Sequence, residues 1–141
     1  MQTTPRPDLA SHLRLTIARA NRRLRQEAGS DLSPSMTAAL ATIERHGPMT
    51  PSELAARERI QRPTATRVLA RLEEMRLIAR TPDPQDRRSS LVAVTPAATA
   101  MLAEQRTRKT AFLAERLDRL EPEDRAALER AADILEKVLS E

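Results

Sequence analysis

The feature that most constrains the fold is a short β-prone segment that directly follows an amphipathic helix. Residues 63–75, PTATRVLARLEEM, have the three- and four-residue apolar spacing of a helix. Residues 77–81 and 90–95 are predicted to pair as two strands, because the segment between them, PDPQDRRS, is too polar and proline-rich to be helical. The rest of the chain is predicted to be helical. We therefore expect a mainly α fold with one small β-hairpin.

Start and stop signals divide the remainder into further helices. Ser33-Pro34 and Thr95-Pro96 each place a hydroxyl cap before a proline, and TPSE at residues 50–53 is a capping box. Gly29 and Gly47 are predicted to end the helices that precede them. The predicted helices cover residues 8–28, 34–46, 52–58, 63–75, a long segment from residue 96 to residue 120, and a last segment from residue 122 onward.

The two faces of residues 63–75 differ in character. One face is apolar, and the other is small and cationic, with Pro63, Thr66, Arg67, Ala70 and Arg71. Two short helices with a tight connection, the second with such a face, are the sequence form of a helix-turn-helix. Small side chains let a helix lie deep in the major groove, and arginine reaches guanine edges or phosphates. An amphipathic helix with a polar exterior explains this segment equally well.

The hairpin favours the helix-turn-helix interpretation. A hairpin that directly follows a recognition-type helix is typical of a wing, and an arginine at its tip can enter the narrow minor groove. Arg87 and Arg88 are the candidates for this role. Because phosphates would repel Asp83 and Asp86, we expect these two acids to pair with neighbouring arginines and to shape the wing.

Composition excludes several other classes of function. The chain has no cysteine, which excludes disulfides and thiolate chemistry. Phe112 is the only aromatic residue, so binding of single strands by base stacking is not expected. Two glycines leave no glycine-rich phosphate loop. His12 and His46 have no metal-ligand spacing and no nearby nucleophile pattern. We therefore predict no enzyme activity, no metal site and no cofactor.

Length and charge fit a single DNA-binding domain. The 141 residues suffice for one core. The net charge is only +4, but residues 45–88 hold 10 basic and 6 acidic side chains. Abundant arginine can also reflect a GC-rich genome. No stretch approaches the roughly 20 apolar residues of a membrane span, and no secretion signal begins the chain. We expect a soluble, cytoplasmic protein without a membrane partner.

The first and last helices carry more apolar surface than a small winged-helix core can cover. Their natural use is a helical bundle shared between two subunits of a homodimer. A monomer whose terminal helices fold back on the winged lobe is the alternative. We accordingly divide the single domain 1–141 into a winged helix-turn-helix lobe, residues 33–95, and a helical dimerisation region, residues 1–32 and 96–141.

Residues 49–96 resemble the helix-turn-helix and wing of the MarR family of bacterial transcription regulators in order and spacing. The closest matches are Leu54-Ala55, Thr66–Val68, Leu72-Glu73, Asp83 followed by Asp86 and Arg88, and Thr95-Pro96. The resemblance runs over nearly the whole chain. It implies an obligate homodimer on a pseudo-palindromic operator, with each recognition helix in a major groove and each wing in the flanking minor groove. It also implies that Arg88 is the minor-groove residue and that Asp86 shapes the loop beside it.

The chain departs from the family pattern in two places. The family usually has glycine where Arg76 stands, and again where Ala97 and Ala98 stand. A left-handed helix end at Arg76 would cost an arginine about 1 kcal/mol more than glycine, which a folded domain can tolerate.

The resemblance further implies a small apolar or aromatic-acid effector held between the dimerisation helices and the winged lobe. The candidate pocket residues, which fit a hydrophobic core equally well, are Leu13, Ile17, Met36, Leu40 and Met101.

The sequence thus predicts a dimeric DNA-binding regulator, a repressor that an effector can release from duplex DNA. A winged-helix module that binds proteins and not DNA is the alternative. The residues expected to contact DNA are Arg62, Pro63, Thr64, Thr66, Arg67, Arg71, Arg87 and Arg88.

Overall fold

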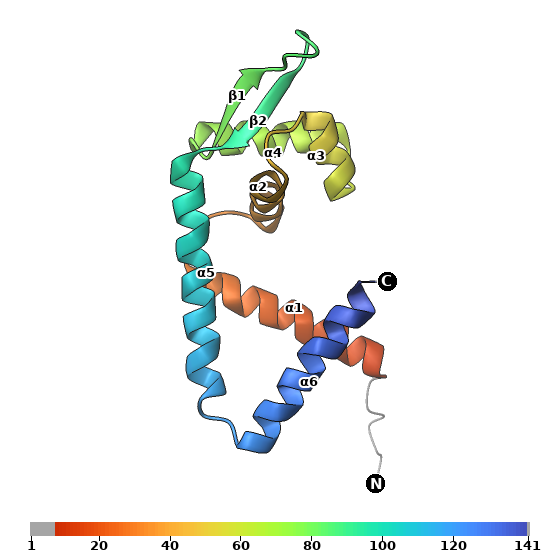
Figure 1. Cartoon of the computed structure of the whole chain (residues 1–141), viewed down its shortest axis with the longest axis vertical. Coiled ribbons are helices and arrows are strands. Elements are labelled where there is room, and N and C mark those ends of the chain that lie inside the picture. The colour runs from red at the N-terminus through yellow and green to blue at the C-terminus, as the bar shows by residue number, and fades with distance from the viewer. Residues whose placement is uncertain (1–7, 141) are drawn as a thin grey trace. The chain divides into compact units, whose positions relative to one another are not determined.

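The computed structural model describes residues 8–140, which fold into six helices and one β-hairpin (Figure 1). The predicted mainly α fold with a small hairpin is therefore confirmed. The elements in chain order are α1 (Leu9–Ala28), α2 (Pro34–His46), α3 (Pro51–Glu58), α4 (Arg62–Glu74), β1 (Ile78–Pro82), β2 (Ser90–Val94), α5 (Pro96–Leu117) and α6 (Pro122–Leu139).

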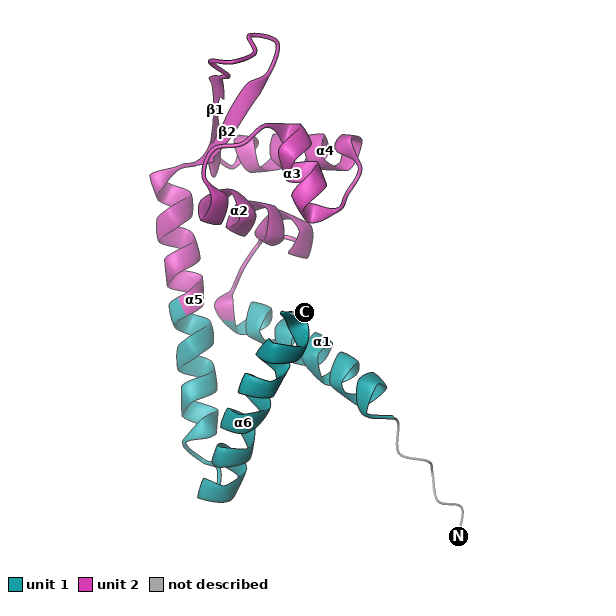
Figure 2. Ribbon diagram, turned by 45° about the vertical axis from the view of Figure 1, so that its right-hand side comes forward, with its two compact units in different colours: residues 1–27, 107–141 teal, residues 28–106 magenta. Residues whose placement is uncertain are grey.

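The chain forms two compact units (Figure 2). Residues 28–106 are the winged-helix lobe, and of the described residues, 8–27 and 107–140 are the terminal unit. The first half of α5 belongs to this lobe, and its Ala98 and Leu102 are part of the lobe's core. The predicted division into a DNA-binding lobe, residues 33–95, and a dimerisation region stays a prediction. Within the described part of the chain, no helix is both long enough and apolar enough to cross a bilayer.

Hydroxyl caps start three helices at the predicted places. The Oγ of Ser33 accepts the Met36 amide at 3.3 Å at the start of α2. Thr50 and Thr95 cap α3 and α5 in the same way, each at 3.2 Å. Each hydroxyl accepts an amide that has no partner within the first helical turn. These local signals fix where the elements of the lobe begin.

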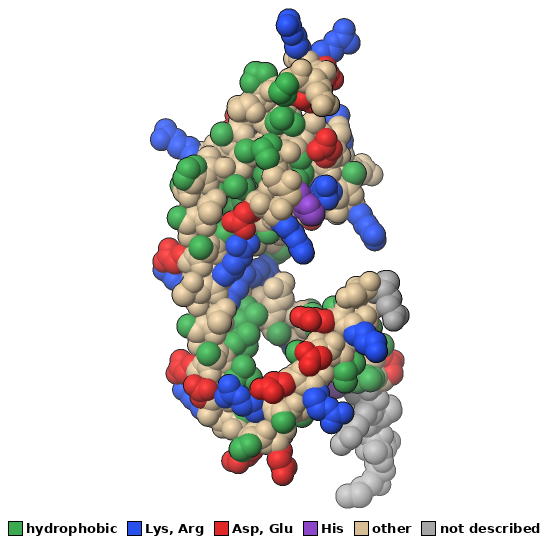
Figure 3. All heavy atoms as spheres, viewed as in Figure 1, with side chains coloured by type: hydrophobic (Ala, Val, Ile, Leu, Met, Phe, Trp, Pro, Cys, Tyr) green, Lys and Arg blue, Asp and Glu red, His purple; other side chains and the backbone are tan. Residues whose placement is uncertain are grey.

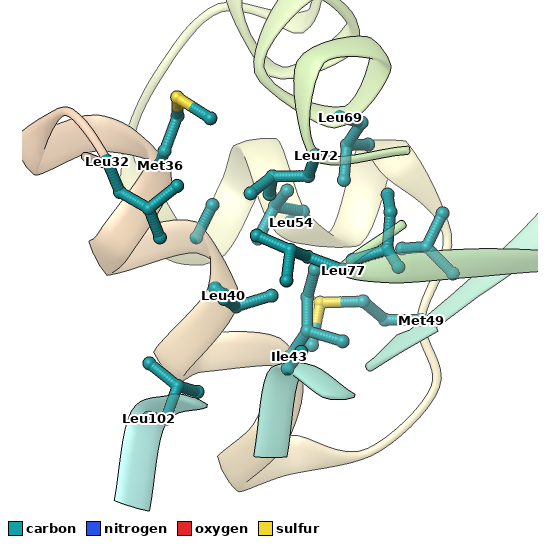
Figure 4. Packing of buried hydrophobic residues seen from close by; sticks show 14 residues of the cluster. Leu32, Met36, Leu40, Ile43, Met49, Leu54, Leu69, Leu72, Leu77 and Leu102 are labelled. Carbon is teal, nitrogen blue, oxygen red and sulfur yellow. The ribbon is translucent and has the colours of Figure 1, made fainter. Parts of the chain in front are cut away.

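The core of the lobe lies between α2, α3, α4 and the hairpin (Figure 4). Leu40, Leu54, Leu69, Leu72 and Val92 are each 0% exposed. The predicted apolar face of α4 is confirmed, because Ala65, Leu69 and Leu72 are buried and Val68 packs partly buried against the core. Burial of one such side chain contributes roughly 1.5–3 kcal/mol, so this face holds α4 firmly with its opposite side outward.

The strands of the hairpin pair antiparallel, from Ile78 opposite Val94 to Pro82 opposite Ser90. Met49 adds a β-bridge to Val92, with distances of 2.8 and 3.1 Å between the main-chain nitrogen and oxygen atoms. The first strand begins one residue later than predicted, because the Leu77 amide still bonds to the Leu72 carbonyl at the end of α4. The second strand ends one residue earlier, where Thr95 becomes the cap of α5.

The terminal unit consists of most of α1, the second half of α5 and all of α6. Two guanidinium groups lie over the ring of Phe112 in α5, with Arg116 at 4.3 Å and Arg23 of α1 at 5.3 Å from the ring centre. No residue of α6 is buried. Large apolar side chains remain exposed on the helices of this unit: Leu9, Leu15, Ile17, Leu113, Leu128, Ile134, Val138 and Leu139.

Candidate nucleic-acid interface

The outer face of α4 carries the predicted DNA-contacting residues. The apolar face of the helix is packed into the core, so the opposite face points away from the lobe. Thr64 lies half-buried at its edge. The exposed residues of this face are Arg62, Pro63, Thr66, Arg67, Ala70 and Arg71. The face is small and cationic, which suits insertion into a groove lined with acceptors.

One predicted contact residue is held by a partner that the sequence did not indicate. Nη1 of Arg62 donates a 2.5 Å hydrogen bond to Oγ of Ser52 in the first turn of α3. This bond joins the first turns of the two helices of the helix-turn-helix. A serine ten residues before an arginine gives no local signal, because their proximity depends on the packing of α3 against α4.

A pocket of about 400 Å³ lies between the start of α2 and the outer edge of α4. Arg67 and Arg71 provide guanidinium donors, and Ser33 and Ser35 provide hydroxyls at the start of α2. Charged and polar donors around an open pocket suit the oxygen atoms of a nucleic-acid backbone. The pocket is completed by Met36, Thr64 and Val68. The sequence predicted Ser33 as a helix cap but did not place it beside the arginines.

Arg87 and Arg88 are exposed in the loop of the hairpin, and basic side chains project at the wing tip in Figure 3. The expectation that Asp83 and Asp86 pair with neighbouring arginines is not what the structure shows. Their Oδ1 atoms instead accept the main-chain amides of Gln85 and Arg88, each at 3.0 Å. Short acidic side chains favour such turns because they reach an amide two residues on. These two acids therefore shape the backbone of the loop, and they do not hold the side chains of Arg87 and Arg88 in ion pairs.

An ion pair that the sequence did not predict joins the wing to α4. Nε of Arg80 on β1 lies 2.5 Å from Oε2 of Glu73. Nη1 of Arg80 also donates to Oγ of Ser90 on β2 at 3.4 Å. The guanidinium of this β1 residue thus links the wing to α4 through Glu73 and to β2 through Ser90. The sequence gives no signal for this ion pair, because the twist of the hairpin decides whether Arg80 and Glu73 meet.

The residues predicted for an effector pocket fall into two groups. Met36 and Leu40 belong to the core of the lobe, and Met101 packs partly buried against it. Leu13 and Ile17 lie on α1 in the terminal unit, where Ile17 is 47% exposed. Met36 and Leu40 are thus core residues, Met36 also lines the pocket between α2 and α4, and a ligand role for any of the five stays a prediction.

Comparisons with known proteins identify the family of this lobe. The MarR family model matches residues 32–90. An HTH-type transcriptional regulator of Mycobacterium tuberculosis is 39% identical over 134 residues, which cover 94% of each chain. A relative in Mycobacterium leprae, also an HTH-type transcriptional regulator, is 38% identical over the same length. These relatives are regulators and not enzymes, as predicted.

Solved structures share the fold over nearly its whole length. A Pseudomonas aeruginosa protein assigned as a transcriptional regulator is 33% identical, with a TM-score of 0.82 and 93% of each chain covered. Wild-type MarR of Escherichia coli has the same fold at 24% identity, with a TM-score of 0.76, covering 96% of this chain and 99% of that one. The sequence, the winged-helix lobe and its relatives agree: this chain belongs to the MarR family of winged helix-turn-helix, DNA-binding transcriptional regulators.

Proposed function

We propose that this protein is a homodimeric repressor that binds a pseudo-palindromic operator in duplex DNA. The observation that carries the proposal is the outer face of α4, where Thr66, Arg67 and Arg71 are exposed on a helix whose other face is buried. Arg67 and Arg71 are assigned to base edges and nearby phosphates in the major groove. Arg87 and Arg88 of the wing are assigned to the flanking minor groove.

The terminal unit supports the homodimer. Four apolar residues of α6, Leu128, Ile134, Val138 and Leu139, are between 50% and 76% exposed. Exposed apolar residues in such number mark an interface in a soluble protein. A second copy of the same unit offers a self-complementary partner, as two-fold symmetry requires. Two subunits would present two α4 helices to successive major grooves, about 34 Å apart.

Release by a small apolar or aromatic-acid effector is the regulatory part of the proposal. Such a ligand lowers DNA affinity if it favours a dimer in which the two α4 helices are wrongly spaced. The protein would act in the cytoplasm, where bacterial DNA lies. Titration of the protein–operator complex with salicylate, as a model aromatic acid, tests this part. Dissociation of the complex supports an effector site, and unchanged affinity argues against this ligand class.

A winged-helix module that binds proteins instead of DNA is the competing function. Salt separates the two, because DNA binding releases counterions and its affinity falls steeply as salt rises. Selection of bound duplexes from a random pool, at a stated salt concentration, is the direct experiment. The proposal expects an inverted repeat whose half-sites lie one helical turn apart. No enrichment of any duplex sequence, with affinity insensitive to salt, would instead favour the protein-binding module.

Repression is tested separately from binding. The selected repeat is placed across a promoter, and transcription is measured in a purified system with and without the protein. Repression requires fewer transcripts when the protein is present, whereas more transcripts would identify an activator.

A further inference from the structure

Two arginines of the winged-helix lobe have backbone conformations that glycine adopts at lower energy. Arg59, just after α3, has φ 53°, and Arg76, just after α4, has φ 59°. A side chain in this left-handed region brings its Cβ close to a carbonyl oxygen, which glycine avoids. Among the described residues, the other positions with positive φ are Gly29 and Gly47. An arginine side chain is therefore present at two places where it costs backbone stability.

These two arginines stand at opposite ends of the recognition helix. Arg59 lies three residues before Arg62, where α4 begins, and Arg76 lies two residues after Glu74, where α4 ends. At 1.5 Å per residue, α4 is about 20 Å long. The major groove is about 12 Å wide and has a phosphate backbone along each side. A helix of this length in the groove therefore has its two ends near the two backbones.

The main chain of both residues is anchored, whereas the guanidinium groups are available. The amide of Arg59 caps α3 on the carbonyls of Ala55 and Ala56, and the carbonyl of Arg76 accepts the hydroxyl of Thr95. Both side chains are exposed. Within residues 8–140, neither guanidinium has a hydrogen bond or ion pair. Arg62 and Arg80, in contrast, are engaged by Ser52 and Glu73.

We propose that Arg59 and Arg76 contact phosphates and clamp the DNA at the two ends of α4. This inference rests on the proposed function, because it assumes that α4 lies in a major groove. An anchored backbone holds the base of each side chain in place, so less freedom is lost when the guanidinium binds a phosphate oxygen. Charge-assisted contacts of this kind offset the backbone cost only when DNA is bound.

The test measures how DNA affinity depends on salt for R59G and R76G. Fluorescence anisotropy with the selected duplex measures Kd at several salt concentrations, from about 50 mM to about 200 mM. Each phosphate contact that is lost should reduce the slope of log Kd against log salt by about 0.9. Affinity should fall by a similar factor for cognate and scrambled duplexes, because phosphates carry no sequence information. The melting temperature should stay equal or rise, since glycine relieves the strained backbone.

Charge-retaining and remote variants make the test specific. R59K and R76K keep a cation that can contact a phosphate, so their slopes should stay close to the wild-type slope. R119A removes an exposed arginine of the terminal unit and serves as the matched control, with no change in slope. The clamp is supported if the slope falls in R59G and R76G and keeps the wild-type value in R59K, R76K and R119A.

The outcomes separate this inference from the proposed function. If the wild-type protein binds its duplex and a glycine variant keeps the full slope, the clamp is overturned for that arginine while DNA recognition stands. If the wild-type protein binds no duplex, both fail. A glycine variant that binds weakly and also melts at a lower temperature overturns the proposal, because the side chain then supports the fold.

Discussion

The hydroxyl of Thr95 donates a 2.8 Å hydrogen bond to the carbonyl oxygen of Arg76. The hydroxyl oxygen of Thr95 also accepts the amide of Ala98 at 3.2 Å, and the Thr95 amide donates to the Leu77 carbonyl at 3.0 Å. One residue therefore caps α5 and secures the corner where α4 passes into the wing. Inside the lobe, the start of α5 and the end of the recognition helix are joined by this residue.

Replacing Thr95 with alanine should destabilise the lobe. The variant loses the helix cap and the bond to the Arg76 carbonyl, for a combined cost of about 1–2 kcal/mol. T95S keeps the hydroxyl and should lose much less. Urea unfolding of both variants gives the free energies, and equal stability of T95A and the wild type would show that the hydroxyl contributes nothing.

The ion pair between Glu73 and Arg80 should couple the wing to α4 only modestly. Their side chains are 48% and 30% exposed, so solvent screens the pair and its coupling energy should be about 0.2–1 kcal/mol. A double-mutant cycle of E73Q, R80Q and the pair measures this energy through unfolding free energies. The coupling should shrink in 1 M salt. A coupling that is zero at low salt would mean that the pair does not hold the wing.

Arg67 and Arg88 should affect DNA binding in different ways. R67A removes the proposed base contact, so it should weaken cognate binding by about 1–3 kcal/mol and reduce discrimination against scrambled duplexes. R88A removes the proposed contact between the wing and DNA, and it should weaken binding to many sequences alike. Anisotropy titrations with cognate and scrambled duplexes compare the two variants. Wild-type affinity in both would remove these residues from the interface.

The local parts of this site were predictable from the sequence. The caps at Ser33, Thr50 and Thr95 and the buried face of α4 depend on neighbours within one or two helical turns. Contacts across elements were not predictable in the same way. The Arg62–Ser52 and Arg80–Glu73 pairs form only because helix packing and hairpin twist bring distant residues together.

The two aspartates of the wing contact other groups than the sequence predicted. Charge alone indicated that Asp83 and Asp86 would pair with arginines. In the structure they accept main-chain amides two residues on, at 3.0 Å. In a tight loop an aspartate reaches its own backbone without ordering a long side chain, and this lower entropy cost favours the turn.

A charge on the apolar surface of α6 should disrupt the proposed homodimer. Leu128 is 50% exposed in the single chain, and L128D would place a carboxylate in the subunit interface at a cost of several kcal/mol. Sedimentation velocity should show a dimer for the wild type and a monomer for L128D, whereas E129Q on the same helix should stay dimeric. A monomeric wild-type protein would contradict the homodimer, and each molecule would then bind DNA through one winged-helix lobe.

Methylation interference on the selected duplex tests the central claim most directly, because a methyl group on guanine N7 blocks an arginine in the major groove. The claim is that the outer face of α4, with Arg67 and Arg71, reads duplex DNA. It predicts that methylated guanines prevent binding in two successive major grooves, about 34 Å apart, and that R67A abolishes the interference at its own guanine. Binding that tolerates methylation of every guanine in the site would contradict it.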